Sequence, residues 1–552
     1  MKLNGSQILA NVLLENGVDT VFGYPGGAVL NIYDALYEYQ DKITHYITAH
    51  EQGAAHAADG YARATGKTGV VLATSGPGAT NLVTGIATAY MDSVPMVAIT
   101  GNVGNSLIGR DSFQEVYIAG ITMPITKHNF VVRKVEDLAN ILRSAFAIAN
   151  SGRPGPVLVD IPKDVTAAIT DYEPAPKQIA EKKSYIDGDS IAEIAEIINN
   201  AKKPVVFFGG GVKNSNAGEL LKKIITKANI PATHTIMAAG VLRYDMPENL
   251  GILGMHGSVV ANKTVDNADV VVAVGSRFSD RVALSPSKFA KRATIIHIDI
   301  DQSEIDKNVK TDYSVIGDAE TVLTQLEALI KENKHDDWFN EINSYKRGIP
   351  ASTGDDKLHP KQIMDILSDT AGEDGLFVTD VGQHQMWAAQ YLHHVKAENF
   401  LTSGGLGTMG YGYGAAIGAQ IGTGRKHVFH ITGDGSFHMN MNEACTAVSY
   451  NLPIISICIN NEVLGMVRQW QTTFYGKRYS ASEPERKTDY VKVAEGFGAK
   501  GYSCSTPEEL KAALEDAMKS GGPAWIECKV DREERVLPMI PAGGSADDII
   551  YE

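Results

Sequence analysis

Cysteine is scarce in this sequence, and no two cysteines have the spacing of a metal or redox motif. The chain has 4 cysteines among 552 residues, which excludes a small secreted domain held together by disulfides. Acidic residues outnumber basic ones, and the net charge is −15. A nucleic-acid partner is therefore not expected. No apolar run is long enough to span a bilayer, and residues 1–18 have the pattern of an amphipathic helix, not of a signal peptide. We therefore expect a cytoplasmic protein with reduced thiols and no membrane contact.

What the sequence has is length and an ordinary globular composition, with 44% hydrophobic and 21% charged residues. A chain of this length divides into about three domains. The polar, partly proline-bearing stretches 170–185 and 348–357 are candidate linkers. They predict domains at residues 1–170, 186–345 and 358–552. Short apolar runs alternate with helical patterns, so we predict an α/β fold with a mostly parallel sheet, flanked by helices, in each domain.

The most informative stretch covers residues 428–470. Its pattern predicts, in order, a buried strand at 428–432, a turn at Gly433-Asp434-Gly435, a helix at 443–450 and a second buried strand at 453–459. The strands of such a strand–helix–strand unit run parallel. Asp434 and Asn461 follow the two strands, so they should leave the sheet at one edge, where α/β proteins bind ligands.

The residue types at this edge suit a magnesium ion. A carboxylate, an amide oxygen and a nearby turn carbonyl are hard oxygen ligands. The glycines allow the backbone to approach an anion, and a helix N-terminus adds positive potential. An Asp-Gly pair by itself has a plainer explanation, because it forms turns in many proteins. Gly-Asp-Gly combined with Asn460-Asn461 at the next strand end is much more specific.

This pattern resembles the diphosphate-binding motif of thiamine diphosphate enzymes. The resemblance implies that Asp434, Asn461 and the carbonyl of Val463 hold Mg²⁺, which in turn holds the cofactor diphosphate. The segment GMVRQW at residues 465–470 is similar to acetohydroxyacid synthases, and the likeness covers nearly the whole chain. On this basis the thiamine diphosphate contacts should be Gln383, His384, Gly407, Met409, Gly435 and Ser436.

Glu51 stands where a predicted strand meets a predicted helix. The helix dipole alone would explain an acidic residue in a first helical turn. The resemblance implies instead that Glu51 hydrogen-bonds the aminopyrimidine of the cofactor and so helps to activate its thiazolium carbon. In the family this glutamate meets the diphosphate site across a subunit interface. We therefore expect at least a homodimer, or a tetramer.

The segment RDSFQE at residues 110–115, followed by PITKHNF at 124–130, is polar loop sequence that would carry little weight alone. By resemblance, Phe113, Gln114 and Lys127 belong to the catalytic pocket. Three positions depart from the family pattern. Arg110 and Asn102 stand where threonine and glutamine are usual, and Met123 replaces an arginine that contacts FAD. Flavin binding should be weaker or different as a result.

The middle of the chain contains Gly209-Gly210-Gly211 after a predicted strand. This triple glycine is by itself a weak nucleotide signal, and the residues alone favour a tight turn. LGMHGS, AVGSRFSDR and HIDID, which begin at positions 253, 273 and 297, are similar to the flavin-binding domain of acetohydroxyacid synthases. The resemblance implies a structural FAD. Its predicted contacts are Gly210, His256, Arg277, Asp299 and Asp318. The two aspartates could otherwise be turn or helix-cap residues.

Three residues are candidates for recognising a second substrate. Arg281 could simply pair with Asp280 or another neighbour. The resemblance implies instead that it binds the carboxylate of the second 2-keto acid, for which a guanidinium fork is well shaped. Met466 and Trp470 could be core residues. The resemblance assigns them to the acceptor side chain, where a large flat indole favours ethyl over methyl by ~1 kcal/mol.

The family activity implied is acetolactate synthesis in branched-chain amino acid biosynthesis. Pyruvate is decarboxylated on thiamine diphosphate, and the hydroxyethyl group passes to a second 2-keto acid, giving 2-acetolactate or 2-aceto-2-hydroxybutyrate. A small regulatory subunit would be a plausible partner. The alternatives are a flavin-dependent pyruvate oxidase, a 2-keto acid decarboxylase, or a catalytically silent homologue that acts in assembly. The decarboxylases usually carry a His-His pair near residues 110–115, which is absent here.

Overall fold

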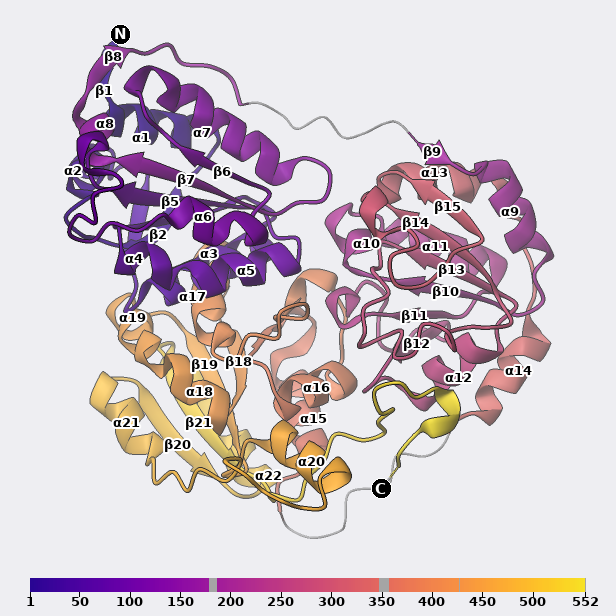
Figure 1. Cartoon of the computed structure of the whole chain (residues 1–552). Coiled ribbons are helices and arrows are strands. Elements are labelled where there is room, and N and C mark those ends of the chain that lie inside the picture. The colour runs from indigo at the N-terminus through magenta and orange to yellow at the C-terminus, as the bar shows by residue number, and fades with distance from the viewer. Residues whose placement is uncertain (178–185, 347–356, 426, 552) are drawn as a thin grey trace.

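The computed structural model describes residues 1–177, 186–346, 357–425 and 427–551. The chain forms an N-terminal, a central and a C-terminal unit, each built on its own sheet (Figure 1). Of the predicted linkers, residues 178–185 and 348–356 lie outside the described ranges, while residues 170 and 171 belong to the short strand β8 (Ile169–Asp171). The exact domain limits therefore stay a proposal. Within the described ranges, no helix has the length and apolar character needed to cross a bilayer.

The N-terminal unit has a six-stranded, fully parallel sheet. Its central strands are buried along their whole length, as parallel strands covered by helices on both faces should be. In sheet order the strands are β3 (Thr44–Ile47), β2 (Thr20–Tyr24), β4 (Gly69–Ala73), β5 (Met96–Asn102), β7 (Pro156–Pro162) and β6 (His128–Val131). The main helices are α1 (Gly5–Glu15), α2 (Leu30–Glu38), α3 (Glu51–Thr65), α4 (Pro77–Asn81), α5 (Val83–Met91) and α7 (Val135–Asn150).

The C-terminal unit repeats this topology. Its parallel sheet has the order β17 (Phe400–Leu401), β16 (Leu376–Thr379), β18 (Val428–Gly433), β19 (Ile454–Asn460), β21 (Ala524–Lys529) and β20 (Lys500–Cys504). Numbered within each unit, both sheets read 2-1-3-4-6-5, which supports a common origin that the two sequences barely show. The helices include α15 (Pro360–Ala371), α16 (Gln383–Tyr391), α17 (Tyr411–Thr423), α18 (Asp434–Asn440), α19 (Ala444–Ser449), α20 (Gly465–Phe474), α21 (Tyr490–Phe497) and α22 (Pro507–Ser520).

The central unit has a seven-stranded sheet in which only the edge strand β9 (Asp187–Gly188) runs antiparallel. The remaining order is β12 (Asn249–Ile252), β11 (Ala232–His234), β10 (Pro204–Phe208), β13 (Val270–Val274), β14 (Thr294–Asp299) and β15 (Tyr313–Ile316). Its helices include α9 (Ile191–Asn200), α10 (Gly210–Asn214), α11 (Gly218–Ala228), α12 (Val259–Asn267), α13 (Ala319–Leu329) and α14 (Asp336–Ser344). The predicted α/β fold with mostly parallel sheets is confirmed in all three units.

Helices α3 and α17 join the N-terminal and C-terminal units by very close packing (Figure 1). A Cβ on Gly418 would collide with the carbonyl of Ala57, and one on Gly60 would collide with Ala415. Because only hydrogen fills these positions, the two helix backbones come within direct contact. The packing holds the N-terminus of α3, which carries Glu51, against the C-terminal unit of the same chain.

Two predicted turns are the beginnings of short helices in the structure. Gly433-Asp434-Gly435 is not a free turn, because Asp434 opens the helix α18. The triple glycine after β10 likewise leads directly into α10. Both segments are too short for a periodic apolar pattern, so glycine content alone favoured a turn.

Candidate active site

Strands β18 and β19 pair in parallel, with Gly433 opposite Ile459. Asp434 and Asn461 each lie directly after these strands, so the predicted parallel pairing, with both residues leaving the same sheet edge, is confirmed. Both side chains are buried, as is Val463. The described residues contain no cluster of three or more His, Cys, Asp or Glu side chains that could hold a metal. The predicted site differs from such clusters, because it combines one carboxylate, one amide oxygen and one backbone carbonyl. These oxygen ligands are the ones that Mg²⁺ prefers.

Burial sets the charge state of Asp434. Desolvation raises the pKa of its carboxyl to about 6. A bound cation would relieve this cost, because it supplies the opposite charge that burial in protein lacks. Asn461 donates from Nδ2 to Gln383 Oε1 at 2.9 Å, which fixes the orientation of the amide. The corner therefore fits a divalent cation.

Gln383 and His384 begin α16 and face the same strand ends. The imidazole of His384 lies 2.7 Å from where a Cβ on Gly433 would stand, so this glycine makes room for the ring. Burial lowers the pKa of His384 to about 4, and the ring is neutral at pH 7. Its Nε2 is buried without a hydrogen-bond partner among the described residues. A buried, unpaired ring nitrogen is what a ligand oxygen or hydroxyl could satisfy.

The glycine-rich segment 403–412 packs over the start of α18. Gly410 N donates to Ser436 Oγ at 3.0 Å, and Met409 Cε lies 3.8 Å from the Cβ position of Gly435. Gly407 has φ +70°, a conformation that favours glycine. The structure thus brings Met409, Gly435 and Ser436 together, as the sequence predicted.

Glu51 forms a second corner in the N-terminal unit. It opens α3, and its Oε2 accepts from Asn81 Nδ2 at 2.9 Å. The start of α4 lies beside it, since a Cβ on Gly78 would stand 3.3 Å from Glu51 Oε1. Gln114 borders the turn just before α4, with its carbonyl 2.7 Å from the Cβ position of Gly76. Glu51 and Gln114 thus both lie against the segment from Gly76 to Gly78.

Glu443 is a site residue that the sequence did not reveal. Its carboxylate accepts from the backbone N–H groups of Ala49 and His50, both at 3.1 Å, immediately before Glu51. A Cβ on Gly53 would collide with it. An acidic residue between two helices gives no signal in the sequence, because its partners lie about 390 residues away.

Two predicted pocket residues lie apart from these corners. The Phe113 ring is 87% exposed on its loop. Lys127 directs its ammonium to the end of α7, where it donates to the carbonyls of Ile148 and Ser151. Among the residues that the structure describes, neither Phe113 nor Lys127 bonds to Glu51 or to the strand-end corner.

A large cavity of about 1790 Å³ opens between the three units. It exceeds the volume of most small-molecule sites and suits a dinucleotide. It is lined by all five predicted flavin contacts and all three predicted acceptor contacts, namely Gly210, His256, Arg277, Asp299, Asp318, Arg281, Met466 and Trp470. Residues that are up to 260 positions apart in sequence thus line one cavity.

The chemistry of the cavity wall fits a flavin nucleotide. Gly211 and Gly275 approach so closely that a Cβ on the first would lie 2.6 Å from the Cα of the second. Thr235 Oγ1, Ser276 Oγ and His256 Nδ1 are buried without a hydrogen-bond partner among the described residues. Such orphaned polar atoms indicate a polar ligand.

Three cavity residues also have the structural roles that the sequence offered as alternatives, namely helix cap, turn and ion pair. Asp318 caps α13, accepting from the N–H groups of Glu320 and Thr321. Asp299 Oδ1 accepts from Asp301 N at 2.9 Å. Arg281 lies 3.9 Å from Asp280, and its side chain is 63% exposed. The long, weak ion pair leaves the guanidinium available to a carboxylate.

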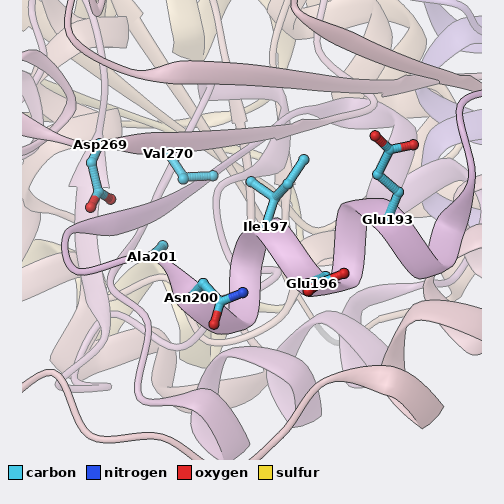
Figure 2. A pocket seen from close by; sticks show the side chains of 7 residues that line it. All are labelled: Glu193, Glu196, Ile197, Asn200, Ala201, Asp269 and Val270. Carbon is cyan, nitrogen blue, oxygen red and sulfur yellow. The ribbon is translucent and has the colours of Figure 1, made fainter.

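A smaller cavity of about 500 Å³ lies at the surface of the central unit, between α9 and the start of β13. Figure 2 shows the carboxylates of Glu193, Glu196 and Asp269 around it. Asp269 already accepts from the N–H groups of Lys202 and Lys203, so its role is structural. None of the predicted site residues lines this cavity.

Comparison with known proteins agrees with this arrangement. Three families match in order along the chain: "Thiamine pyrophosphate enzyme, N-terminal TPP binding domain" at residues 3–121, the central domain at 191–326 and the "C-terminal TPP binding domain" at 380–528. The acetolactate synthase large subunit of Porphyra purpurea is 43% identical over 99% of this chain and 95% of its own length.

Two further relatives show the same likeness. The acetolactate synthase isozyme 2 large subunit of Escherichia coli is 42% identical over 99% of both chains. The mitochondrial acetolactate synthase catalytic subunit of Saccharomyces cerevisiae is 44% identical over 99% of this chain and 84% of its own length. The chain therefore belongs to the acetolactate synthase family of thiamine pyrophosphate enzymes.

Proposed function

We propose that this chain is the catalytic subunit of an acetolactate synthase. It decarboxylates pyruvate and transfers the two-carbon unit to a second 2-keto acid, giving 2-acetolactate or 2-aceto-2-hydroxybutyrate for branched-chain amino acid synthesis. The observation that carries the proposal is identity above 40% to acetolactate synthase subunits over nearly the full chain. Most side chains proposed for this activity lie at the strand-end corner, at Glu51 and in the large cavity, whereas Phe113 and Lys127 lie apart from them within one chain.

Bound thiamine diphosphate supplies a carbon nucleophile and an electron sink, which together let a 2-keto acid lose CO₂. Asp434, Asn461 and the Val463 carbonyl would hold Mg²⁺ beside the diphosphate. Gln383, His384, Gly407, Gly435 and Ser436 would surround the diphosphate, and Met409 would support the cofactor. Glu51 would serve as the hydrogen-bonding and proton-exchanging carboxyl for the aminopyrimidine; Asn81 donates to it, and Glu443 bonds the backbone immediately before it.

The cavity side of α20 receives the acceptor. Arg281 binds its carboxylate through a guanidinium fork. Met466 and Trp470 contact its side chain, and Trp470 favours ethyl over methyl. Phe113, Gln114 and Lys127, which all belong to the N-terminal unit, complete the pocket across the proposed subunit interface.

FAD occupies the large cavity in a structural role, since the reaction transfers no electrons to a flavin. Gly210, His256, Arg277, Asp299 and Asp318 hold it, together with the unpaired hydroxyls of Thr235 and Ser276. Met123 is 63% exposed and does not line the cavity. No arginine from this position reaches the flavin, so its binding is weaker than the family pattern implies.

The active unit is at least a homodimer, with Glu51 of one subunit serving the diphosphate site of the other. The face beside Gln114 carries exposed apolar side chains, including Phe113, Tyr117 and Met123, and burial in a dimer would remove them from water. The relatives are named large or catalytic subunits, which supports a small regulatory partner. Cys458, Cys504 and Cys528 are free and buried, as suits a reducing cytoplasm.

Product analysis tests the proposal. Purified protein is incubated with pyruvate, thiamine diphosphate and Mg²⁺, with and without 2-ketobutyrate. We expect acetolactate in the first case and mainly 2-aceto-2-hydroxybutyrate in the second, with a visible flavin spectrum. Acetaldehyde as the main product, or O₂ consumption matching pyruvate loss, would instead identify a decarboxylase or an oxidase.

A further inference from the structure

Helix α20 carries two residues of the large cavity on one face. Met466 and Trp470 are four positions apart, so they stand one turn above each other, and both line the cavity. Arg468 lies two positions from each, which places it on the opposite side of the helix. Its side chain is buried away from the cavity.

The Arg468 guanidinium ties two distant segments to this helix. Its Nε lies 2.8 Å from Glu483 Oε1, and its Nη2 lies 2.6 Å from Glu533 Oε1. Its Nη1 also donates to the carbonyl of Arg532 at 3.3 Å. The guanidinium carbon lies 4.3 Å from the ring centroid of Tyr479. One planar cation thus uses its donors and its face at the same time, which a lysine cannot do.

Other bonds reinforce the same two segments. Leu464 N donates to Ser482 O at 2.8 Å just before α20 begins. Tyr479 OH pairs with Thr472 Oγ1 at 3.1 Å. On the far side, Gln469 exchanges hydrogen bonds with the backbone of Val536 at 2.9 and 3.0 Å. Helix α20 is therefore held between residues 479–483 and 532–536.

From this geometry we infer that Arg468 is a positioning residue for acceptor selectivity. Because a helix is rigid, the bonds that fix the Arg468 face also fix the rotation of α20 and hence where Met466 and Trp470 stand in the cavity. Arg468 touches no substrate. The inference rests on the proposed assignment of Trp470 to the acceptor, and it adds that the arginine on the opposite face sets the preference between ethyl and methyl acceptors.

The test compares Arg468→Met with wild type in mixtures of pyruvate and 2-ketobutyrate. The ratio of 2-aceto-2-hydroxybutyrate to acetolactate should fall about three- to tenfold, because a loosened indole discriminates less well against a missing methylene. Arg468→Lys should fall between the two, since it keeps one ion pair and loses the stacking. Glu533→Gln, which removes one partner and leaves the helix sequence intact, should lower the ratio in the same direction.

Arg243→Met is the matched control. Arg243 also pairs with two carboxylates, Asp245 at 3.0 Å and Glu373 at 2.8 Å, but these lie far from α20 in the chain. This variant should leave the product ratio unchanged. A general loss of stability would lower the total rate in either variant without altering the ratio.

Tryptophan fluorescence supplies a readout that needs no activity. The chain has 4 tryptophans; Trp338, Trp387 and Trp525 are at most 2% exposed, and Trp470 is only half-buried. Acrylamide should therefore report mainly on Trp470, and quenching should increase in Arg468→Met but not in Arg243→Met. An unchanged product ratio together with unchanged quenching would overturn the inference. Absence of both products in wild type would instead overturn the proposed function.

Discussion

The guanidinium of Arg63 lies 2.8 Å from the carboxylate of Asp92, and both side chains are almost fully buried. Arg63 also pairs with Asp59 at 2.6 Å. Asp92 accepts from the N–H groups of Gly404 and Gly405 at 3.1 and 2.6 Å. This pair therefore connects the N-terminal unit to the glycine-rich segment 403–412, which carries Gly407 and Met409.

Asp92→Asn should destabilise the protein. The substitution leaves a buried arginine with one carboxylate fewer, and breaking a buried pair typically costs about 3 kcal/mol. The free energy of unfolding from chemical denaturation measures this loss. Asp245→Asn is the control, because Asp245 pairs with Arg243 at the surface, where an ion pair contributes less than ~1 kcal/mol. Equal losses in the two variants would contradict the assigned role.

Glu51→Gln should remove turnover and leave the fold intact. The amide can still accept a hydrogen bond from Asn81, so local structure should persist. It cannot exchange a proton, and loss of such a group typically costs about 100-fold or more in rate. Acetolactate formation and circular dichroism are measured on the same sample. Retained activity in a folded variant would disprove the role of Glu51.

Most of the strand framework could be predicted from sequence, because fully buried parallel strands are short β-branched runs. The predicted strands 428–432 and 453–459 match β18 and β19 to within one residue at each end. The parallel topology of β18 and β19 also followed from the sequence, since a helix separates them. Helix α18 did not, because its seven residues are too few to show periodicity.

Some residues of the candidate site could be predicted from the sequence and others could not. Side chains placed by the end of a strand, such as Asp434 and Asn461, could be predicted from local pattern. Contacts that depend on packing between units could not. Glu443 bonds the backbone at residues 49–50, and Arg468 bonds Glu483 and Glu533 across two loops. Only the assembled chain brings such partners together.

Ser276→Ala should weaken flavin binding without destabilising the protein. The Ser276 hydroxyl is buried and unpaired among the described residues, so its removal deletes an unsatisfied polar group and should raise the free energy of unfolding of the flavin-free protein by up to ~1 kcal/mol. If FAD satisfies this hydroxyl, its loss should raise the dissociation constant about five- to tenfold. Flavin fluorescence titration measures the constant. Tighter or equal binding would place the flavin elsewhere.

Asp160 should make stability depend on pH. Burial raises the pKa of its carboxyl to about 6, despite hydrogen bonds from Thr100 and Asn102, whereas an unfolded aspartate titrates near ~4. The folded state therefore binds more protons than the unfolded state between these values. Asp160 contributes its full stability below pH ~4, and this contribution falls as the pH rises through about 6.

The loss associated with Asp160 should amount to at most ~3 kcal/mol. It is measured as the free energy of unfolding at several pH values between 4 and 7. Asp160→Asn cannot ionise, so the decline over this range should be smaller in the variant than in wild type. Asp164→Asn is the matched control, because the Asp164 side chain lies at the surface and its hydrogen bonds among the described residues are all to Asn105. Parallel curves for wild type and Asp160→Asn would show that the buried carboxyl titrates at its ordinary pKa.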